Sequence, residues 1–270
     1  MAKLWVLLLT AVSVCAQSST SLPPRIVEIK VPANIAANAE ASRAGVPGVL
    51  ALKAVVALPQ GFDPRLTWPV LLITAPSGAS AVQSLGAYTN TALALGWVVT
   101  AVDGPLVRTE QDNSSFAWAM ISSLLDQLHA SWPQSKYWPF ACAGFSGGSK
   151  RAAMTAANMM RQQDTVIGVF MGGCNEDRAT TGLEISKPGP KFLDVPMFLS
   201  NGRRDSIAGP DQGQKVRLSM EQTGFRKIRM ENYDEGHRLD TNQVKAALEW
   251  FRPAPRAVAA TNMIRSGVRK

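Results

Sequence analysis

The segment that most constrains the fold of this 270-residue chain is Gly144-Phe145-Ser146-Gly147-Gly148. An apolar run typical of a buried strand, 140–143, leads into it, and a helix-forming run, 151–160, follows it. The backbone must therefore turn tightly, and glycines two positions before and two after the serine let it bend without Cβ clashes. The pattern predicts a strand–turn–helix unit that leaves the Ser146 hydroxyl exposed.

The rest of the chain alternates apolar, β-branched runs with helical patterns. This order is typical of a mostly parallel α/β sheet flanked by helices on both faces. Neither an internal repeat nor a low-complexity linker interrupts it, so one domain is predicted over residues 24–253. Strands are expected at 25–31, 49–58, 70–74, 98–102, 166–171, 195–199 and 228–233, and helices at 81–95, 116–129, 213–223 and 243–251.

Residues 1–16 are predicted to be a signal peptide rather than part of the fold. A lysine precedes the apolar run 4–14, which is too short to span a bilayer, and a small-residue cleavage site follows. We therefore expect a secreted or periplasmic protein without stable membrane insertion after cleavage. An uncleaved anchor is the alternative, and a lipid anchor on Cys15 is less favoured because Val14 is bulky for that position.

Composition limits the partners and cofactors. The formal net charge is +8, and a basic C-terminal tail is expected at 254–270. A solvated tail is its ordinary interpretation, and no nucleic-acid binding is predicted because basic and aromatic residues do not interleave. Two histidines and no Cys-x-x-Cys predict no metal site, and no other cofactor is expected. Cys142 and Cys174 are expected to be buried thiols, with a single disulfide as the alternative.

A phosphate-binding loop is the rival interpretation of the glycine-rich segment, which continues Ser149-Lys150-Arg151. That loop requires Gly before the Lys and Ser or Thr after it, and this sequence has neither. The Gly-x-Ser-x-Gly pattern itself arises by chance about 0.1 times in such a chain. Its meaning therefore depends on whether partners for Ser146 lie elsewhere in the sequence.

A serine hydroxyl becomes a good nucleophile when a histidine takes its proton and a carboxylate orients that histidine. His237 follows the expected strand 228–233 on a loop, where it is well placed to act as the base. His129 lies at the end of an amphipathic helix, where a surface or helix-terminal role is ordinary. His237 is therefore the predicted base for Ser146.

The carboxylate is sought in loops that follow strands, because ligands of open α/β sheets gather at the carboxyl ends of the strands. Asp205 ends the loop after the expected strand 195–199, and Asp177 follows the strand 166–171. Asp205 is the predicted acid of the triad, and Asp177 is the reserve candidate.

Together, Ser146, Asp205 and His237 occur in the order that resembles the α/β-hydrolase superfamily. The likeness spans most of the mature chain. The separations of 59 residues from 146 to 205 and 32 from 205 to 237 are similar to those of small lidless esterases, such as feruloyl esterases, polyhydroxyalkanoate depolymerases and acyl-protein thioesterases. The resemblance implies an α/β-hydrolase fold and hydrolysis of carboxylic esters through an acyl-enzyme intermediate.

One segment departs from that pattern. Many members carry His-Gly before the residue whose N–H completes the oxyanion hole, whereas Ala75-Pro76-Ser77-Gly78 follows the expected strand 70–74 here. Proline has no N–H, so the resemblance assigns the oxyanion donors to the backbone N–H groups of Ser77 and Gly147. The Ser77 hydroxyl is either a third donor or a stabiliser of the turn.

The stretch between Met171 and Val195 is too short for a large cap domain, and we expect an ordinary or slightly long loop there. An open pocket would favour small-molecule or polymer-borne esters as substrates. Two alternatives remain from the sequence. One is a peptidase, amidase or thioesterase on the same fold, and the other is a non-catalytic binding protein, which would be expected to have lost a triad residue.

Overall fold

The computed structural model describes residues 23–46, 51–105 and 114–252. The predicted signal peptide at 1–16 and the basic tail at 254–270 lie outside the described residues. Within those residues, no helix combines the length and the apolar character needed to cross a membrane.

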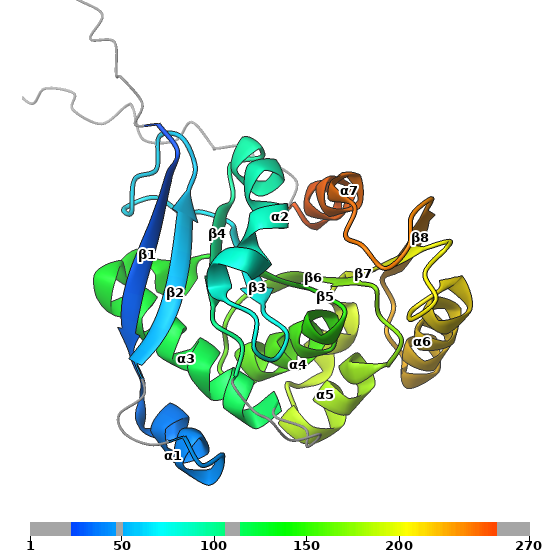
Figure 1. Cartoon of the computed structure of the whole chain (residues 1–270), viewed down its shortest axis with the longest axis horizontal. Coiled ribbons are helices and arrows are strands. Elements are labelled where there is room, and N and C mark those ends of the chain that lie inside the picture. Colours follow the sequence, from blue (N-terminus) through cyan, green and yellow to red (C-terminus); the bar gives the residue numbers. More distant parts are fainter. Residues whose placement is uncertain (1–22, 47–50, 106–113, 253–270) are drawn as a thin grey trace, which may run out of the picture.

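An eight-stranded sheet forms the centre of the described chain, in the order β1-β2-β4-β3-β5-β6-β7-β8 (Figure 1). β1 pairs with β2, and β2 with β4, in antiparallel fashion, and every other pair is parallel. The strands are β1 (Arg25–Pro32), β2 (Ala51–Leu58), β3 (Val70–Thr74), β4 (Val98–Val102), β5 (Phe140–Phe145), β6 (Val166–Gly172), β7 (Met197–Gly202) and β8 (Ile228–Tyr233). The predicted mostly parallel sheet is confirmed.

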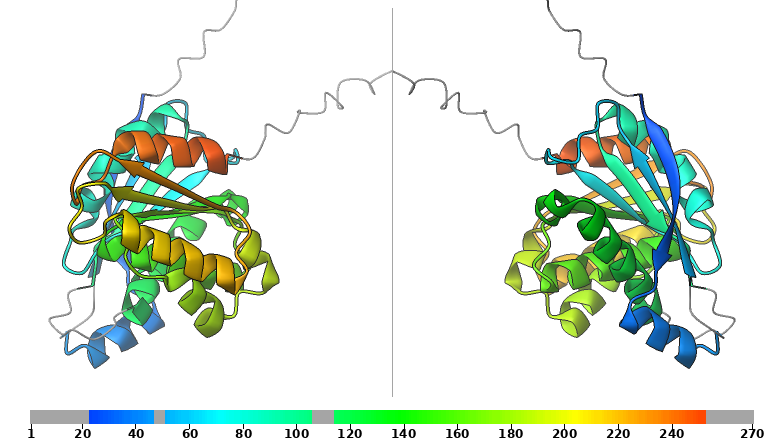
Figure 2. Two further views of the ribbon diagram at one scale, coloured as in Figure 1. Left: turned by 90° about the vertical axis from the view of Figure 1, so that its right-hand side faces the viewer. Right: turned by 90° about the vertical axis from the view of Figure 1, so that its left-hand side faces the viewer.

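Helices cover both faces of this sheet, as the two side views of Figure 2 show. α2 and α7 lie on one face, and α3, α4, α5 and α6 lie on the other, while α1 packs against α3. The helices are α1 (Ile35–Arg43), α2 (Ala81–Ala94), α3 (Ser114–Ser131), α4 (Gly147–Arg161), α5 (Arg178–Ser186), α6 (Pro210–Thr223) and α7 (Thr241–Phe251), with 3-10 turns η1 (Pro133–Tyr137) and η2 (Pro190–Asp194).

The core has two halves, one on each side of the sheet. All five residues of β3 are buried, because a strand covered on both faces places apolar side chains on each. Leu72 points to the half that contains Leu124 of α3, whereas Leu71 points to the half that contains Tyr88 of α2 and Leu248 of α7. This double layer explains why the strands read as continuous apolar runs.

The region between β6 and β7 corrects one prediction. A plain loop was expected there, but the structure has α5 and η2. α5 packs closely on α4, since a Cβ on Gly182 would lie 3.0 Å from the Cβ of Ala157. The predicted strand at 195–199 also begins later, at Met197, after η2 ends at Asp194. The described residues contain no large cap domain, in agreement with the predicted fold.

The two cysteines that remain after the predicted cleavage are buried free thiols. Cys142 lies in β5, where its sulfur contacts that of Met159 at 3.7 Å, and Cys174 follows β6. Burial raises the pKa of both thiols. In the described ranges, no group of three or more His, Cys, Asp or Glu side chains is arranged to hold a metal ion.

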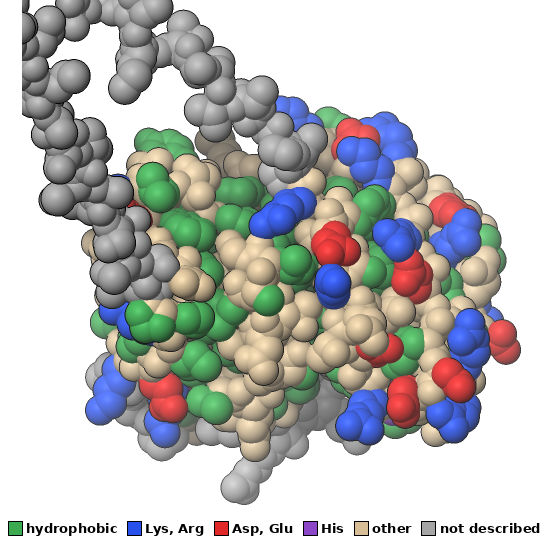
Figure 3. All heavy atoms as spheres, turned by 90° about the horizontal axis from the view of Figure 1, so that it is seen from above, with side chains coloured by type: hydrophobic (Ala, Val, Ile, Leu, Met, Phe, Trp, Pro, Cys, Tyr) green, Lys and Arg blue, Asp and Glu red, His purple; other side chains and the backbone are tan. Residues whose placement is uncertain are grey.

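The face viewed in Figure 3 shows how charge is distributed over part of the surface. Charged side chains gather toward the right of this view, and blue Lys and Arg side chains lie among red Asp and Glu side chains. Charges of both signs thus alternate on this face, and no large patch of one sign is visible on it. The absence of nucleic-acid binding stays a prediction from the sequence.

Candidate active site

Ser146 lies at the junction of β5 and α4, in the predicted strand–turn–helix unit. Its backbone has φ 55° and ψ −122°, a conformation that a residue with a Cβ adopts only under strain. A backbone hydrogen bond of 2.8 Å from the Ser146 N–H to the Gly172 carbonyl fixes the turn against β6. The side chain is thereby held out at the carboxyl edge of the sheet.

The glycines around Ser146 are required to different degrees. A Cβ on Gly144 would lie 2.3 Å from the carbonyl of Gly148, and a Cβ on Gly148 would lie 2.3 Å from the carbonyl oxygen of Thr74. A Cβ on Gly147 would meet only the Pro76 side chain, at an ordinary 3.5 Å. At the two outer glycines, the backbone of the turn therefore lies against the backbones of β3 and α4. Of the three glycines of the turn, only these two exclude a side chain.

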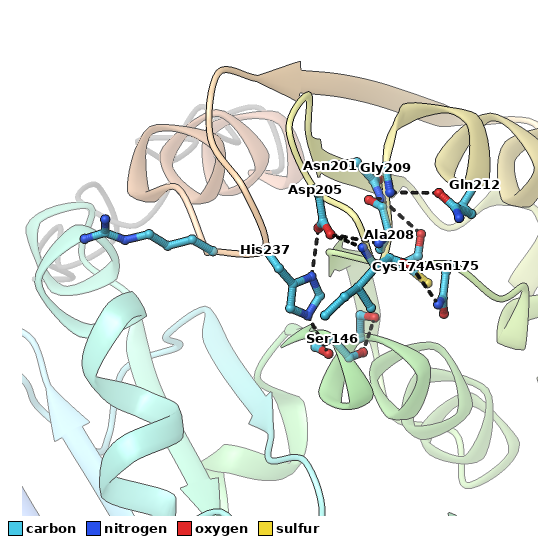
Figure 4. Close-up of polar contacts among 12 residues, drawn as sticks. Ser146, Cys174, Asn175, Asn201, Asp205, Ala208, Gly209, Gln212 and His237 are labelled. Atoms are coloured by element: carbon cyan, nitrogen blue, oxygen red, sulfur yellow. Dashed lines mark hydrogen bonds and ion pairs between the residues drawn. The ribbon is translucent and has the colours of Figure 1, made fainter.

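The structure brings the three predicted triad residues together. His237 lies on the loop between β8 and α7, and its Nε2 is 2.9 Å from the Ser146 Oγ. Its Nδ1 is 2.8 Å from the Oδ2 of Asp205, which lies on the loop after β7. Figure 4 shows the imidazole between the two partners. Three side chains from separate loops thus form one continuous hydrogen-bonded chain.

The environment of Asp205 decides the tautomer of the histidine. The Asp205 side chain is fully buried, and its second oxygen accepts the N–H groups of Ile207 and Ala208, both at 2.8 Å. Burial would raise the pKa of this carboxyl, but the bonds from the Ala208 N–H, His237 and the Ile207 N–H together hold it below its usual value. An ionised Asp205 only accepts, so the His237 Nδ1 carries the proton and Nε2 faces Ser146 as an acceptor.

The reserve acid and the second histidine have other partners. One oxygen of Asp177 accepts the N–H groups of Ala179 and Thr180 at 3.0 Å, and the other accepts the Ser219 hydroxyl at 2.7 Å. This carboxylate therefore caps the start of α5. His129 lies in the last turn of α3, where its Nδ1 is 2.8 Å from the Ser135 hydroxyl.

The loop proposed for the oxyanion donors lies against the start of α4. A Cβ on Gly147 would lie 3.5 Å from the Pro76 Cβ, and a Cβ on Gly104 would lie 1.9 Å from the Pro76 carbonyl oxygen, so Pro76 is close to both glycines. Gly147 is the first residue of α4, where backbone N–H groups have no acceptor within the helix. The structure thus places the loop Ala75-Pro76-Ser77 next to Gly147, and the roles of the Ser77 and Gly147 N–H groups stay predictions.

Arg151 is a site residue that the sequence interpretation missed. Its guanidinium donates to the Ala75 carbonyl at 2.6 Å and to the Ser77 Oγ at 2.7 Å, and the side chain is largely buried. The Ser77 hydroxyl thus accepts a bond that ties the loop to α4. A sequence signal existed, because Arg151 is the one charged residue among the buried residues of that helix.

A cavity of about 310 Å³ opens beside Ser146. It lies between the end of β3, the helix α2 and the turn that carries the serine, and Phe145 and Leu239 form part of its wall. The Phe145 ring also packs on His237, with 4.8 Å between the ring centroids. Ser146, His237 and a mostly apolar cavity therefore meet at one place.

No protein-family model matches this sequence, and no curated protein sequence shows a significant match to it. Solved structures do match. A ferulic acid esterase is 14% identical, with a TM-score of 0.56 over 85% of this chain and 96% of that one. Dienelactone hydrolase from Anabaena variabilis is 17% identical, with a TM-score of 0.59 over 84% of this chain and 97% of that one. The chain has the α/β-hydrolase fold.

A third solved structure with the α/β-hydrolase fold is a bacterial heroin esterase. It is 15% identical to this chain, with a TM-score of 0.56 over 84% of this chain and 82% of that one. At identities this low, the structural similarity establishes only the shared α/β-hydrolase fold, which the order of the sequence elements predicted. The chemistry of this chain has to be argued from its own residues.

Proposed function

We propose that this chain is a serine hydrolase that cleaves carboxylic esters through an acyl-enzyme intermediate. The observation that carries the proposal is the continuous chain from Ser146 through His237 to Asp205, with contacts of 2.9 and 2.8 Å. Such distances lie within the range in which a base takes a proton from a hydroxyl. The esterases and hydrolases among the similar solved structures are in keeping with it.

In the proposed reaction, the Ser146 Oγ attacks the ester carbonyl carbon while the His237 Nε2 takes the hydroxyl proton. Asp205 stabilises the imidazolium that forms and keeps the Nδ1 proton in place. The imidazolium then gives its proton to the departing alkoxide oxygen, and the alcohol leaves. Water, deprotonated by the same nitrogen, attacks the acyl-enzyme and releases the carboxylic acid and the free serine.

The negative charge on the carbonyl oxygen would be stabilised by the backbone N–H groups of Gly147 and Ser77. Donors fixed in advance at the place where charge develops supply much of the catalysis in such reactions. Arg151 supports this role, because its two hydrogen bonds hold the loop that carries Ser77. The guanidinium therefore acts as a positioning residue rather than as a donor to the substrate.

A small-molecule or polymer-borne ester is the proposed substrate class. A cavity of about 310 Å³ lies at the low end of the range of small-molecule pockets, and no large cap domain covers it among the described residues. The proposed setting, outside the cytoplasm, depends on the sequence pattern of residues 1–16. The mass of the mature chain tests it, because cleavage would leave Gln17 as the first residue.

Thioester and amide cleavage on the same triad are the alternatives, together with a role in binding only. A panel of p-nitrophenyl acetate, an acyl thioester and a p-nitroanilide separates the first two. The binding alternative requires that the purified chain turn over none of them. The triad geometry favours catalysis, because an inactive binder gains nothing from a strained serine at φ 55°.

The decisive experiment compares the mature chain with Ser146→Ala and with Ser131→Ala, an exposed serine at the end of α3 that serves as the matched control. We expect p-nitrophenyl acetate hydrolysis by the wild type and by the control, and loss of at least about a thousandfold in Ser146→Ala. A fluorophosphonate should add its mass to the wild type and not to Ser146→Ala. Equal turnover by all three proteins would remove Ser146 from the mechanism.

A further inference from the structure

Two residues that line the cavity beside Ser146 carry buried hydroxyl groups with no hydrogen-bond partner among the described residues. The two residues are Ser84 and Tyr88, which lie four residues apart and therefore on the same side of α2. Tyr88 is only 2% exposed, and the Ser84 Oγ is buried as well. Both side chains line the same cavity as the nucleophile.

Unpaired hydroxyls at such places are unusual, because most buried polar groups in native proteins have a partner. Other buried hydroxyls nearby follow that rule. The Thr89 hydroxyl, next to Tyr88 in α2, donates to the Leu85 carbonyl at 2.8 Å, and the Thr74 hydroxyl reaches the Gly148 carbonyl at 2.6 Å. Of the three buried hydroxyls without a partner in the described part of the chain, those of Ser84 and Tyr88 belong to residues that line this cavity, whereas Ser200 does not line it.

The residues that line the cavity limit the kind of chemical group that can bind in it. No Lys, Arg, Asp, Glu or His is among the described residues that line it. A charged group would be buried there without a counter-charge, which is strongly unfavourable. Burial also raises the pKa of the Tyr88 hydroxyl well above its usual value, so this group stays protonated and donates. A neutral acceptor oxygen fits these conditions.

The position of Tyr88 is fixed by packing. Its ring lies edge-on against Phe170 of β6, with 6.2 Å between the ring centroids, and it belongs to the apolar core under α2 and α7. A ring held in this way cannot swing its hydroxyl out to solvent without disrupting the core. The hydroxyl is therefore a preset donor rather than a mobile surface group.

We propose that the cavity beside Ser146 is a specificity pocket for one limb of the ester substrate, and that Ser84 and Tyr88 bind a neutral oxygen carried by that limb. The inference rests on the proposed esterase function. This oxygen lies either in the acyl limb or in the alcohol limb. In either limb it is an ether, hydroxyl or carbonyl oxygen that a short chain joins to the ester group. A plain hydrocarbon limb of the same length leaves both hydroxyls unsatisfied.

The test uses pairs of esters that differ by one oxygen in place of one CH₂. For the acyl limb, p-nitrophenyl 3-methoxypropanoate is compared with p-nitrophenyl pentanoate, and the oxygen is then moved one position along a longer chain. For the alcohol limb, 2-methoxyethyl acetate is compared with butyl acetate. Each rate is divided by the rate of hydroxide-catalysed hydrolysis, which removes the intrinsic effect of the oxygen on reactivity.

We expect the wild type to prefer the oxygen-containing ester in one of the two limbs by about tenfold to a hundredfold in kcat/KM. Tyr88→Phe should abolish most of that preference and raise activity on the hydrocarbon partner. Ser84→Ala should reduce the preference to a smaller degree. Tyr137→Phe, which removes the same atom from a tyrosine that is 72% exposed, is the matched control and should retain the wild-type preference.

A second readout does not depend on turnover. Removal of an unpaired buried hydroxyl leaves stability unchanged or raises it, so Tyr88→Phe should melt no lower than the wild type. Titration of the same ester pairs into Ser146→Ala should show the same preference in affinity. Equal kcat/KM within each pair, or an unchanged preference in both Tyr88→Phe and Ser84→Ala, would overturn the inference and leave the cavity merely hydrated.

The two proposals fail in different ways. If the proposed esterase function is wrong, no ester of either series is hydrolysed, or hydrolysis persists in Ser146→Ala. If only the specificity pocket is wrong, hydrolysis still requires Ser146, but the oxygen makes no difference in either limb.

Discussion

Replacing Asp205 with asparagine should disable His237 while leaving the fold in place, and the hydrogen bonds show why. The Asp205 oxygen that faces away from His237 accepts two backbone N–H groups, from Ile207 and Ala208, at 2.8 Å each. The single carbonyl oxygen of an asparagine must stay at that position. If the amide turned, its NH₂ would face both donors and leave two N–H groups without an acceptor, that of Ala208 buried and that of Ile207 partly buried.

The NH₂ of Asp205→Asn is therefore directed at the His237 Nδ1, which now has to accept. The imidazole proton moves to Nε2, 2.9 Å from the Ser146 Oγ, where it donates to the serine instead of taking its proton. Return to the productive tautomer requires the amide to turn, and two orphaned N–H groups cost about 4 kcal/mol together. At about 1.4 kcal/mol for each factor of ten, kcat should fall about a thousandfold.

The assay is steady-state hydrolysis of p-nitrophenyl acetate, with KM expected to change little because substrate contacts are untouched. Asp177→Asn is the matched control, since it makes the same chemical change in the carboxylate that caps α5 and asparagine is an equally good cap. Its kcat should stay within about twofold of the wild type. Retention of kcat within tenfold by Asp205→Asn, or a larger loss in Asp177→Asn, would refute this reasoning.

Three further outcomes are expected. Gly144→Ala places a Cβ 2.3 Å from backbone atoms and should destabilise the fold by about 3 kcal/mol or more. Gly147→Ala, the control, should melt within a few degrees of the wild type. The reverse order of the two variants in a thermal melt would contradict the packing described for the turn. Arg151→Met removes both hydrogen bonds to the loop that carries Ser77. We expect kcat to fall about tenfold to a hundredfold with little change in KM. An unchanged kcat would show that the loop holds its position without these bonds.

The third concerns Asp164, whose pKa burial raises to about 6. The folded state then binds this proton more tightly than the unfolded state, so the contribution of Asp164 to stability falls between about pH 4 and about pH 6 and is level above. Asp164→Asn removes that loss, and its advantage should grow over the same interval to about 1 kcal/mol, a value reduced for partial exposure. Thermal melts at several pH values measure it, and a constant difference would contradict the burial argument.

Local sequence patterns predicted a large part of the fold. The bounds of β3, β4 and β8 agree with the predicted strands, because each is a short apolar or β-branched run that ends where its pattern ends. The helices α1 and α5 were missed. α1 is rich in small residues and is capped by Asn34, the residue before its first turn. The Asn34 side chain also donates to Ser122 and Asp126 of α3, so part of what holds α1 in place comes from a distant segment.

Some residues of the candidate site were likewise predicted from the sequence, and others were not. Ser146, Asp205 and His237 were predicted from the sequence, because a tight glycine-flanked turn and loops that follow strands can be recognised from residue order. The structure places these three side chains in hydrogen-bond contact. Arg151 and Tyr88 were not found, since a periodic pattern records that a helix position is buried but not which distant groups it meets.

What the sequence determined by itself was therefore most of the strands and helices, the tight serine turn and the identity of the residues available as base and acid. Only the tertiary structure decided that β2 lies between β1 and β4, that Asp205 rather than Asp177 bonds to His237, and that the Ser84 and Tyr88 hydroxyls share a cavity with the nucleophile. The physical reason is the distance along the chain over which each kind of interaction acts. Propensity, turn chemistry and periodicity act between neighbours in the chain, whereas hydrogen bonds and packing at the site join segments that only the folded sheet brings into contact.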